Sequence, residues 1–237
     1  MPGYAYFAPM NIGIKDVLYK VRFFFIPYLI LIATCLIIKL THTREEIFFA
    51  INARNWPWAD KLAPYVTDVG DGWTTITLAV ILLMFSYRKS FVLAGSYALS
   101  SGLVAQSLKF IFDAPRPKLY FQDQLSRIHF VAGTNQLSHH SFPSGHTITA
   151  FSTAIVIAYW AKNKFWGLPL LLLAALVGYS RMYLSQHFFE DVTAGSVIGV
   201  VVTVMWLWWV DNREFLRSPK WSKGLLTCPE IGLHKKV

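Results

Sequence analysis

Long runs of apolar residues, separated by short polar stretches, divide the chain into six segments. These segments cover residues 23–38, 73–87, 90–108, 147–161, 165–179 and 192–210. Several are shorter than the roughly 20 residues that a helix needs to cross the hydrocarbon core of a bilayer. Flanking Trp, Tyr, Lys and Arg side chains can extend them into the headgroup region. The pattern predicts an all-α fold, namely an integral membrane bundle of six transmembrane helices.

The residues before the first apolar segment also show a helical pattern. Apolar side chains recur at helical spacing at Ile12, Ile14, Val17, Leu18 and Val21. Such spacing predicts an interfacial helix that leads into the membrane. We therefore expect an N-terminal interfacial segment over residues 1–22, a membrane domain over 23–210 and a basic tail over 211–237. Residues 1–9 are expected to be a non-native leader if Met10 is the natural start.

Composition and charge support a membrane protein. The chain has 237 residues, of which 54% are hydrophobic and 15% are charged, against about 25% charged in soluble domains. A formal net charge of +9 would suggest a nucleic-acid partner if the protein were soluble. With six spans, however, 13 of the 22 Lys and Arg residues fall on the side that holds both termini. The positive-inside rule then predicts cytoplasmic termini and no nucleic-acid partner.

Three polar clusters fall at the ends of the predicted spans on the opposite membrane face. The first runs from Lys109 to Pro117, the second from Phe142 to His146 and the third from Ser180 to Asp191. This placement predicts an active site at one membrane face.

The cations of these clusters have the chemistry of a phosphate site. Arg116 and Arg181 can each hold phosphate oxygens in a bidentate fork, and Lys109 adds a point charge. Ser144 and Gly145 precede a predicted helix, whose free N–H groups would face an anion. We therefore predict that all five residues bind the substrate phosphate.

The remaining polar residues have the chemistry of catalysis. His187 and Asp191 are four residues apart, so on a helix they would share one face, with Asp191 orienting the imidazole. A histidine held in this way is a plausible nucleophile toward phosphorus. His146, from another cluster, would protonate the leaving oxygen. Together these residues predict phosphoryl transfer without a metal or cofactor.

Each of these residues also has a purely structural interpretation. The three cations can anchor span ends by snorkelling, Lys109 and Asp113 can form an ion pair, and His187 and Asp191 can share a structural hydrogen bond. These alternatives would have to hold independently in three clusters on one membrane face, which favours the functional interpretation.

A metal site is the other alternative, because His139 and His140 lie close to His146 in the sequence. The tight ligand spacing of the H-E-x-x-H kind does not occur among them. We therefore predict no metal site.

At these three clusters the sequence resembles the type 2 phosphatidic acid phosphatase (PAP2) family of integral membrane lipid phosphatases, which shares its site with vanadium-dependent haloperoxidases. The family pattern is K-x6-R-P, then P-S-G-H, then S-R-x5-H-x3-D. Residues 109–117, 143–146 and 180–191 match it at every position, in order and with gaps of 25 and 33 residues. One short motif would be weak evidence, whereas three in register are specific.

The resemblance implies a role for each residue. His187 would form a phosphohistidine, Asp191 would orient it, and His146 would first protonate the leaving group and then activate water. The five phosphate-binding residues would stabilise the equatorial oxygens of the transition state, and the family needs no metal.

The resulting prediction is a membrane phosphatase that hydrolyses a lipid phosphate or lipid diphosphate at the outer leaflet. We expect a bacterial inner-membrane protein whose active site faces the periplasm or cell exterior, and whose partners are its lipid substrate and membrane lipids. The alternatives are a lipid phosphotransferase with the same site and, from a different class, a membrane transporter. A soluble haloperoxidase-like enzyme is excluded by the spans.

Substrate identity stays open at this stage. The candidates are undecaprenyl diphosphate, phosphatidylglycerol phosphate, phosphatidate and lipid A. We expect the loops 41–72 and 118–142 to shape the lipid entrance, because both carry aromatic side chains suited to the membrane interface.

Overall fold

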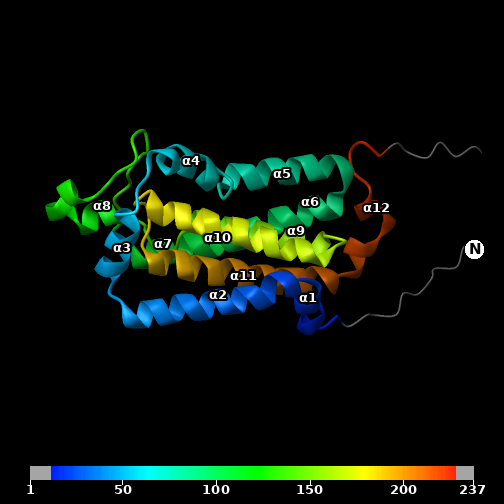
Figure 1. Cartoon of the computed structure of the whole chain (residues 1–237). Helices are drawn as coiled ribbons and strands as arrows, with labels where there is room; N and C mark the ends of the chain where they lie inside the picture. The colour runs from blue at the N-terminus through cyan, green and yellow to red at the C-terminus, as the bar shows by residue number, and fades with distance from the viewer. Residues whose placement is uncertain (1–11, 228–237) are drawn as a thin grey trace, which may run out of the picture.

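The computed structural model describes residues 12–227, and helices are the only regular secondary structure in that part of the chain. Long helices run side by side along the bundle, and short ones lie at its two ends (Figure 1). The helices are α1 Ile14–Lys20, α2 Arg22–Thr41, α3 Arg44–Asn52, α4 Pro57–Asp68, α5 Gly72–Phe85, α6 Tyr87–Tyr97, the π-helical η1 Ala98–Ala105, α7 Gln106–Phe112, α8 Pro117–Tyr120, the 3₁₀ turn η2 Gln122–Arg127, α9 Gly145–Trp160, η3 Lys164–Trp166, α10 Gly167–Tyr183, α11 Phe189–Asp211, η4 Glu214–Arg217 and α12 Pro219–Ser222. The all-α prediction is confirmed for residues 12–227.

Within residues 12–227, four helical stretches are long and apolar enough to cross a membrane. They are Arg22–Thr41, Tyr87–Tyr120, Lys164–Tyr183 and Phe189–Asp211. The pair α4 and α5, bent by 48°, makes a fifth span if it is counted as one unit. The remaining predicted span corresponds to α9, which has only 16 residues. The protein is therefore an integral membrane protein with four or five candidate spans, and the count of six stays a prediction.

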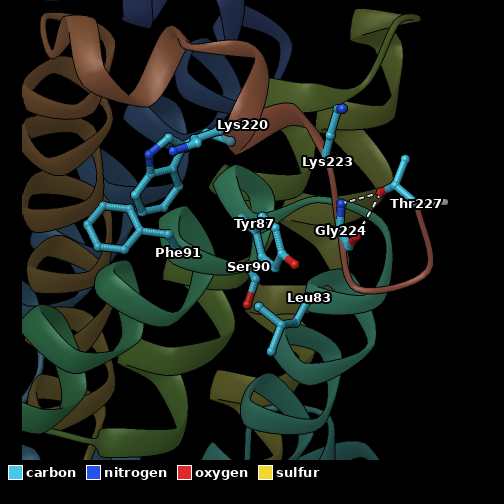
Figure 2. A pocket seen from close by; sticks show the side chains of 9 residues that line it. Leu83, Tyr87, Ser90, Phe91, Lys220, Lys223, Gly224 and Thr227 are labelled. Atoms are coloured by element: carbon cyan, nitrogen blue, oxygen red, sulfur yellow. Dashed lines mark hydrogen bonds between the residues drawn. The ribbon is translucent and has the colours of Figure 1, made fainter. Parts of the chain in front are cut away.

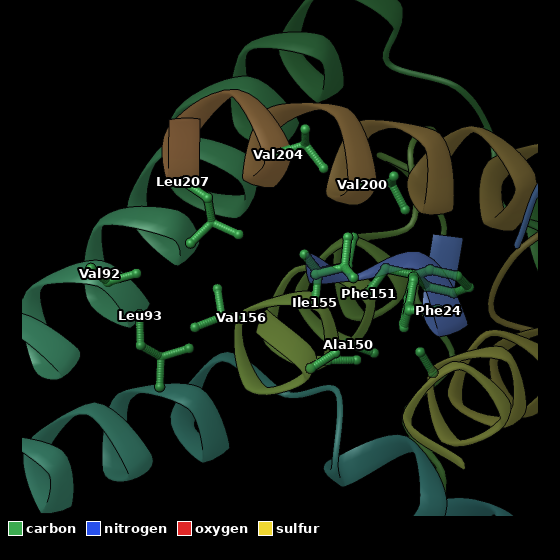
Figure 3. Close-up of a cluster of buried hydrophobic side chains, with 14 of the residues drawn as sticks. Phe24, Val92, Leu93, Ala150, Phe151, Ile155, Val156, Val200, Val204 and Leu207 are labelled. Carbon is green, nitrogen blue, oxygen red and sulfur yellow. The ribbon is translucent and has the colours of Figure 1, made fainter. Parts of the chain in front are cut away.

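Helix α9 lies at the centre of the bundle. Its side chains Phe151, Ile155 and Val156 are buried and face Val200 and Leu207 of α11 (Figure 3). A helix that is apolar on all sides needs neighbours on all sides, and α9 packs against both α10 and α11. Its short length is consistent with this position, because helices rather than lipid surround it.

Two glycines of α11 allow α9 and α11 to approach closely. A Cβ added at Gly199 would lie 2.7 Å from the Ile148 carbonyl oxygen, and one at Gly195 would lie 2.9 Å from the Ser144 carbonyl oxygen. Small residues permit such backbone contact between membrane helices. This approach places the N-terminus of α9 beside the N-terminus of α11, where the second and third sequence clusters lie.

The expectation that residues 41–72 form a loop is wrong, because they contain α3 and α4. Thr43 accepts a hydrogen bond from the Glu46 amide, and the Glu46 side chain accepts one from the Thr43 amide, which together cap α3. Pro57 stands at the first position of α4, where its missing N–H costs nothing. The Thr43–Glu46 cap and Pro57 both mark the start of a helix, and neither is visible in the pattern of apolar residues.

The amphipathic N-terminal segment forms α1, which packs against the bundle. Val17 and Val21 are almost fully buried in the main core cluster, and the Ile12 amide donates to Asn212 Oδ1 at 3.1 Å. The apolar face of this segment is thus covered by protein at Val17 and Val21, whereas Ile14 stays exposed. Residues 1–9 lie outside the described range, and the division into residues 1–22, 23–210 and 211–237 stays a prediction.

Candidate active site

The three sequence clusters meet at one end of the bundle. The first spans α7 and the start of α8, the second leads into α9, and the third connects α10 to α11. Both ends of the described chain lie at the opposite end of the bundle (Figure 1). Direct contacts join the clusters: the Arg116 side chain reaches Gln186 and His187, and the Ser144 amide donates to the Asp191 carbonyl oxygen at 3.0 Å.

His187 and Arg116 form the centre of the site. His187 is 1% exposed, and its Nε2 lies 3.3 Å from Arg116 Nη1. A guanidinium can only donate, so this contact assigns the lone pair of the imidazole to Nε2 and its proton to Nδ1. The ring nitrogen that carries the lone pair therefore faces the Arg116 guanidinium.

Burial keeps the imidazole of His187 neutral. Loss of hydration lowers the pKa of His187 well below its ordinary value, and the positive charges of Arg116, Arg181 and Lys109 act in the same direction. The imidazole of His187 is thus unprotonated at neutral pH in the free protein.

Asp191 lies beside His187, but not in the way that the spacing predicted. His187 precedes α11, which begins at Phe189, so the two residues do not share a helical face. Asp191 is in the first turn of α11, and its Oδ2 lies 3.5 Å from His187 Nδ1. That distance is too long for a good hydrogen bond, and Nδ1 has no hydrogen-bond partner within the described residues.

The Asp191 carboxylate is held by two other donors. Ser141 Oγ donates to Asp191 Oδ2 at 2.5 Å, and the Phe188 amide donates to the same oxygen at 2.9 Å. Ser141 is fully buried. The sequence analysis missed Ser141, whose only signal is its place two residues before the P-S-G-H motif.

The N-terminus of α9 lies against the first cluster. Ser144 is the N-cap of α9, and its Oγ accepts a hydrogen bond from Thr147 Oγ1 at 2.9 Å. A Cβ added at Gly145 would lie 3.5 Å from Lys109 Nζ. The ammonium of Lys109 therefore lies next to the amides that begin the helix.

Arg181 is the third cation of the site and is 8% exposed. Its Nη1 donates to Thr67 Oγ1 at 3.0 Å, while its buried Nε has no partner within residues 12–227. A buried donor without an acceptor is rare in proteins. A phosphate oxygen is the kind of acceptor that would satisfy it.

His146 has a carboxylate beside it that the sequence analysis missed. Asp71 Oδ2 lies 3.5 Å from His146 Nε2. Asp71 caps α5 by accepting a hydrogen bond from the Trp73 amide at 2.7 Å. A Cβ at Gly70 would lie 2.7 Å from the His146 carbonyl oxygen, so the break between α4 and α5 needs glycine to fit against His146.

The alternative ion pair of Lys109 with Asp113 is not formed. Asp113 ends α7 in a left-handed conformation, and its carboxylate lies 3.2 Å from His140 Nδ1 and 3.6 Å from His139 Nδ1. Among residues 12–227, no cluster of three or more His, Cys, Asp or Glu side chains has the arrangement of a metal site.

A cavity of about 340 Å³ opens beside the site. Lys109, Arg116 and His139 line it together with the apolar side chains of Phe110 and Leu137. Phe110, Ile111 and Phe112 of α7 are all largely exposed. Cations and exposed apolar surface therefore adjoin one another at this end of the bundle.

Fold and site together define a membrane-embedded phosphatase, a hydrolase that acts on phosphate esters. The sequence pattern of the PAP2 superfamily matches residues 89–215, and the chain belongs to that superfamily.

Individual relatives agree with this assignment. The chain is 25% identical over 175 residues to a lipid A 4'-phosphatase of Porphyromonas gingivalis, covering 69% of this chain and 71% of the relative. The crystal structure of Aquifex aeolicus LpxE matches with a TM-score of 0.60 and 31% identity, covering 68% of this chain and 93% of that one. A PAP2-type phosphatidylglycerolphosphate phosphatase from Bacillus subtilis matches with a TM-score of 0.59 and 26% identity, covering 83% and 99%.

Proposed function

We propose that the protein hydrolyses a lipid phosphate or lipid diphosphate through a phosphohistidine on His187, without a metal ion. The observation that carries the proposal is that the buried cations Arg116 and Arg181 have no carboxylate partner within residues 12–227. Within residues 12–227 neither has a carboxylate within 4.0 Å; Arg116 is held by main-chain carbonyls and Gln186, and Arg181 by Thr67. Uncompensated buried charge is costly, so an anionic ligand would stabilise this site.

The first half-reaction follows from the tautomer of His187. The Nε2 lone pair attacks phosphorus, the N–P bond forms, and the bond from phosphorus to the leaving oxygen breaks. Burial and the nearby cations lower the pKa of His146 to about 3 in the free protein. The charge of the bound phosphate, together with Asp71, stabilises the imidazolium of His146 in the complex. His146 then donates its proton to the leaving oxygen. Asp191 faces Nδ1–H and stabilises the positive charge that the ring acquires.

In the second half-reaction His146, now neutral, takes a proton from water. The hydroxide attacks phosphorus, the N–P bond breaks, and inorganic phosphate leaves while His187 regains its lone pair. Lys109, Arg116, Arg181 and the first amides of α9 stabilise the charge on the equatorial oxygens in both transition states. These fixed cations perform the charge neutralisation that Mg²⁺ performs in many other phosphoryl-transfer enzymes.

The proposal of a lipid substrate rests on the surroundings of the site. The exposed apolar side chains of α7 adjoin the cavity that holds Lys109 and Arg116, so an amphiphile can contact both. The relatives described above act on lipid A or a phosphatidylglycerol phosphate by their names, which supports the same class.

The test is phosphate release by the purified full chain from a panel of lipid phosphates and diphosphates. We expect turnover to persist in EDTA, His187→Ala to abolish it, and His42→Ala, at an exposed histidine outside the site, to leave it unchanged. Substrate labelled with ³²P should give a protein label that is stable in base and labile in acid. Activity that EDTA removes and zinc restores would overturn the metal-free mechanism, and phosphate passed to a lipid acceptor instead of water would indicate a phosphotransferase.

We further propose that the active site faces the cell exterior or periplasm, because the opposite end carries most of the basic residues. A membrane-impermeant maleimide applied to intact cells should label Asn135→Cys, near the site, and should not label Lys162→Cys, at the basic end. Both positions are exposed. The reverse labelling pattern would contradict this orientation.

A further inference from the structure

A cavity of about 760 Å³ lies at the end of the bundle opposite the candidate active site. This open cavity is lined by the end of α5, the start of α6 and residues 220–227, as Figure 2 shows. Leu83, Tyr87 and Phe91 form its apolar side, and Lys220 and Lys223 stand on the other. The proposed phosphatase reaction uses none of these residues.

The chain after α12 is anchored where it forms the wall of this cavity. The Tyr87 amide donates to the Lys223 carbonyl oxygen at 2.8 Å, and the Leu226 amide donates to the Met84 carbonyl oxygen at 2.9 Å. The second bond satisfies a carbonyl at the C-terminus of α5 that has no partner within its own helix. Gly224 is buried against α5, where an added Cβ would overlap the backbone of Met84. The wall is therefore part of the fold.

The charges at this wall are available to a ligand. Lys220 and Lys223 are exposed, and among residues 12–227 no carboxylate lies within 4.0 Å of either ammonium. The neighbouring Arg88, by contrast, is paired with Asp211 at 3.1 Å. Lys side chains next to a membrane attract anionic lipid headgroups, and Tyr and Trp are typical of the interface.

An apolar groove continues from the cavity between α5 and α6. Its volume is about 180 Å³, and it shares Leu83 and Ser90 with the cavity. Ile76, Val80 and Ala94 line it further along the two helices, and all three are exposed to the bundle surface. A ligand can thus contact the two lysines and a strip of membrane-facing apolar surface at once.

We propose that this cavity and groove form a second, non-catalytic lipid site: the cavity binds the headgroup of an anionic phospholipid, and the groove binds one of its acyl chains. Charge complementarity selects the headgroup, and the continuous groove selects a lipid over a free anion. The site lies at the basic end of the bundle and is independent of the proposed phosphatase function.

The first experiment is native mass spectrometry of the detergent-purified full chain with phosphatidylglycerol or phosphatidylcholine of identical acyl chains. Both are phosphodiesters, so hydrolysis of a monoester does not consume them. We expect preferential retention of phosphatidylglycerol and a roughly tenfold weaker affinity in Lys220→Gln/Lys223→Gln. The matched control Lys15→Gln/Lys162→Gln removes two exposed cations away from the cavity and should keep the preference. The active-site variant Arg116→Gln should keep it too, which separates this site from the catalytic one.

The second experiment tests the acyl-chain groove. Ala94→Trp fills the groove from an exposed position, so it should weaken phosphatidylglycerol binding and leave the phosphatase activity intact. Glycerol 1-phosphate should not compete at equal concentration. Competition by that soluble anion, equal retention of the two lipids, or the same loss in the lysine control would each overturn the proposal. Equal retention would leave the cavity to another occupant, such as residues 228–237.

Discussion

The buried hydrogen bond between Ser141 and Asp191 leads to a testable prediction. It distinguishes a residue that positions Asp191 from one that binds the substrate. Ser141 Oγ donates to Asp191 Oδ2 at 2.5 Å, with both residues almost fully buried. Ser141→Ala removes this donor without adding bulk. The second donor to the same oxygen, the Phe188 amide at 2.9 Å, remains in place. The Asp191 carboxylate therefore keeps one of these two hydrogen bonds and loses the other, which helps to fix its orientation toward His187.

The size of the effect follows from the type of bond. A hydrogen bond to a charged group contributes about 1.5–3 kcal/mol, which corresponds to roughly a 10- to 150-fold change in rate if it is realised only in the transition state. Because the Phe188 amide remains, we expect the lower limit, a roughly tenfold fall in kcat. The KM should change little, since Ser141 contacts the carboxylate and not the phosphate-binding cations.

The assay is steady-state phosphate release by Ser141→Ala, with Ser100→Ala as the matched control. Ser100 is equally buried and donates to the Ser96 carbonyl oxygen at 2.7 Å, away from the site. Ser141→Thr, which keeps the hydroxyl, should recover part of the lost kcat. A double-mutant cycle then tests the route of the effect. If Ser141→Ala costs the same tenfold in an Asp191→Asn background, Ser141 does not act through Asp191 and the reasoning is refuted.

Three further predictions follow from the site and the packing. Vanadate, which adopts the five-coordinate geometry of the phosphorus transition state, should inhibit turnover, and full activity at millimolar vanadate would argue strongly against the site. Because the pKa of His187 is lowered, its imidazole should stay neutral, with the proton on Nδ1, from pH 8 down to below the ordinary histidine pKa of about 6.5. The measurement is ¹⁵N-histidine NMR, with the His187 signals assigned by their loss in His187→Gln. An imidazolium at pH 6 would contradict the prediction. Gly199→Ala should destabilise the bundle by about 1–3 kcal/mol, because its Cβ would lie 2.7 Å from a backbone oxygen of α9. Gly102→Ala, with no atom within 4 Å of the added Cβ, is the control, and equal thermal unfolding midpoints for the two variants would refute the packing argument.

The sequence predicted the apolar segments and the motif residues because both are local properties of the chain. Residues 90–108 and 192–210 correspond to long helices, and the three motifs meet as expected. The elements that it missed depend on capping instead of apolar periodicity. Helix α3 starts at a reciprocal Thr43–Glu46 cap and α4 at Pro57. Neither helix contains a long apolar run, so a search for apolar segments does not find them.

The missed site residues were missed for a different reason. Thr67 is in the last turn of α4 and Asp71 is in the break between α4 and α5. Both lie more than 70 residues before the residues that they contact. Their proximity to His146 and Arg181 depends on the bend of 48° between α4 and α5. The spacing of residues in the sequence does not predict that angle. The helical spacing of His187 and Asp191 likewise predicted their proximity for the wrong reason, since the turn that begins α11 brings them together.

Burial and pairing of the cations identify the site independently of any motif. Arg88 and Lys20 share Asp211, and Arg44 and Lys39 share Glu190, so their charges are compensated within the protein.

Arg116 and Arg181 are the more deeply buried cations, yet within residues 12–227 they have only neutral acceptors. Folding places these two charges in a poorly hydrated region without a counter-ion, and such an arrangement is costly unless a ligand supplies the negative charge. In the proposed mechanism, the same fixed charges need no reorganisation when a phosphoryl group passes between oxygen and nitrogen, which is the condition for electrostatic stabilisation of a transition state. The distribution of charge in the fold therefore favours an anion-binding site at Arg116 and Arg181, and the family motifs favour the proposal that the anion is a phosphoryl group.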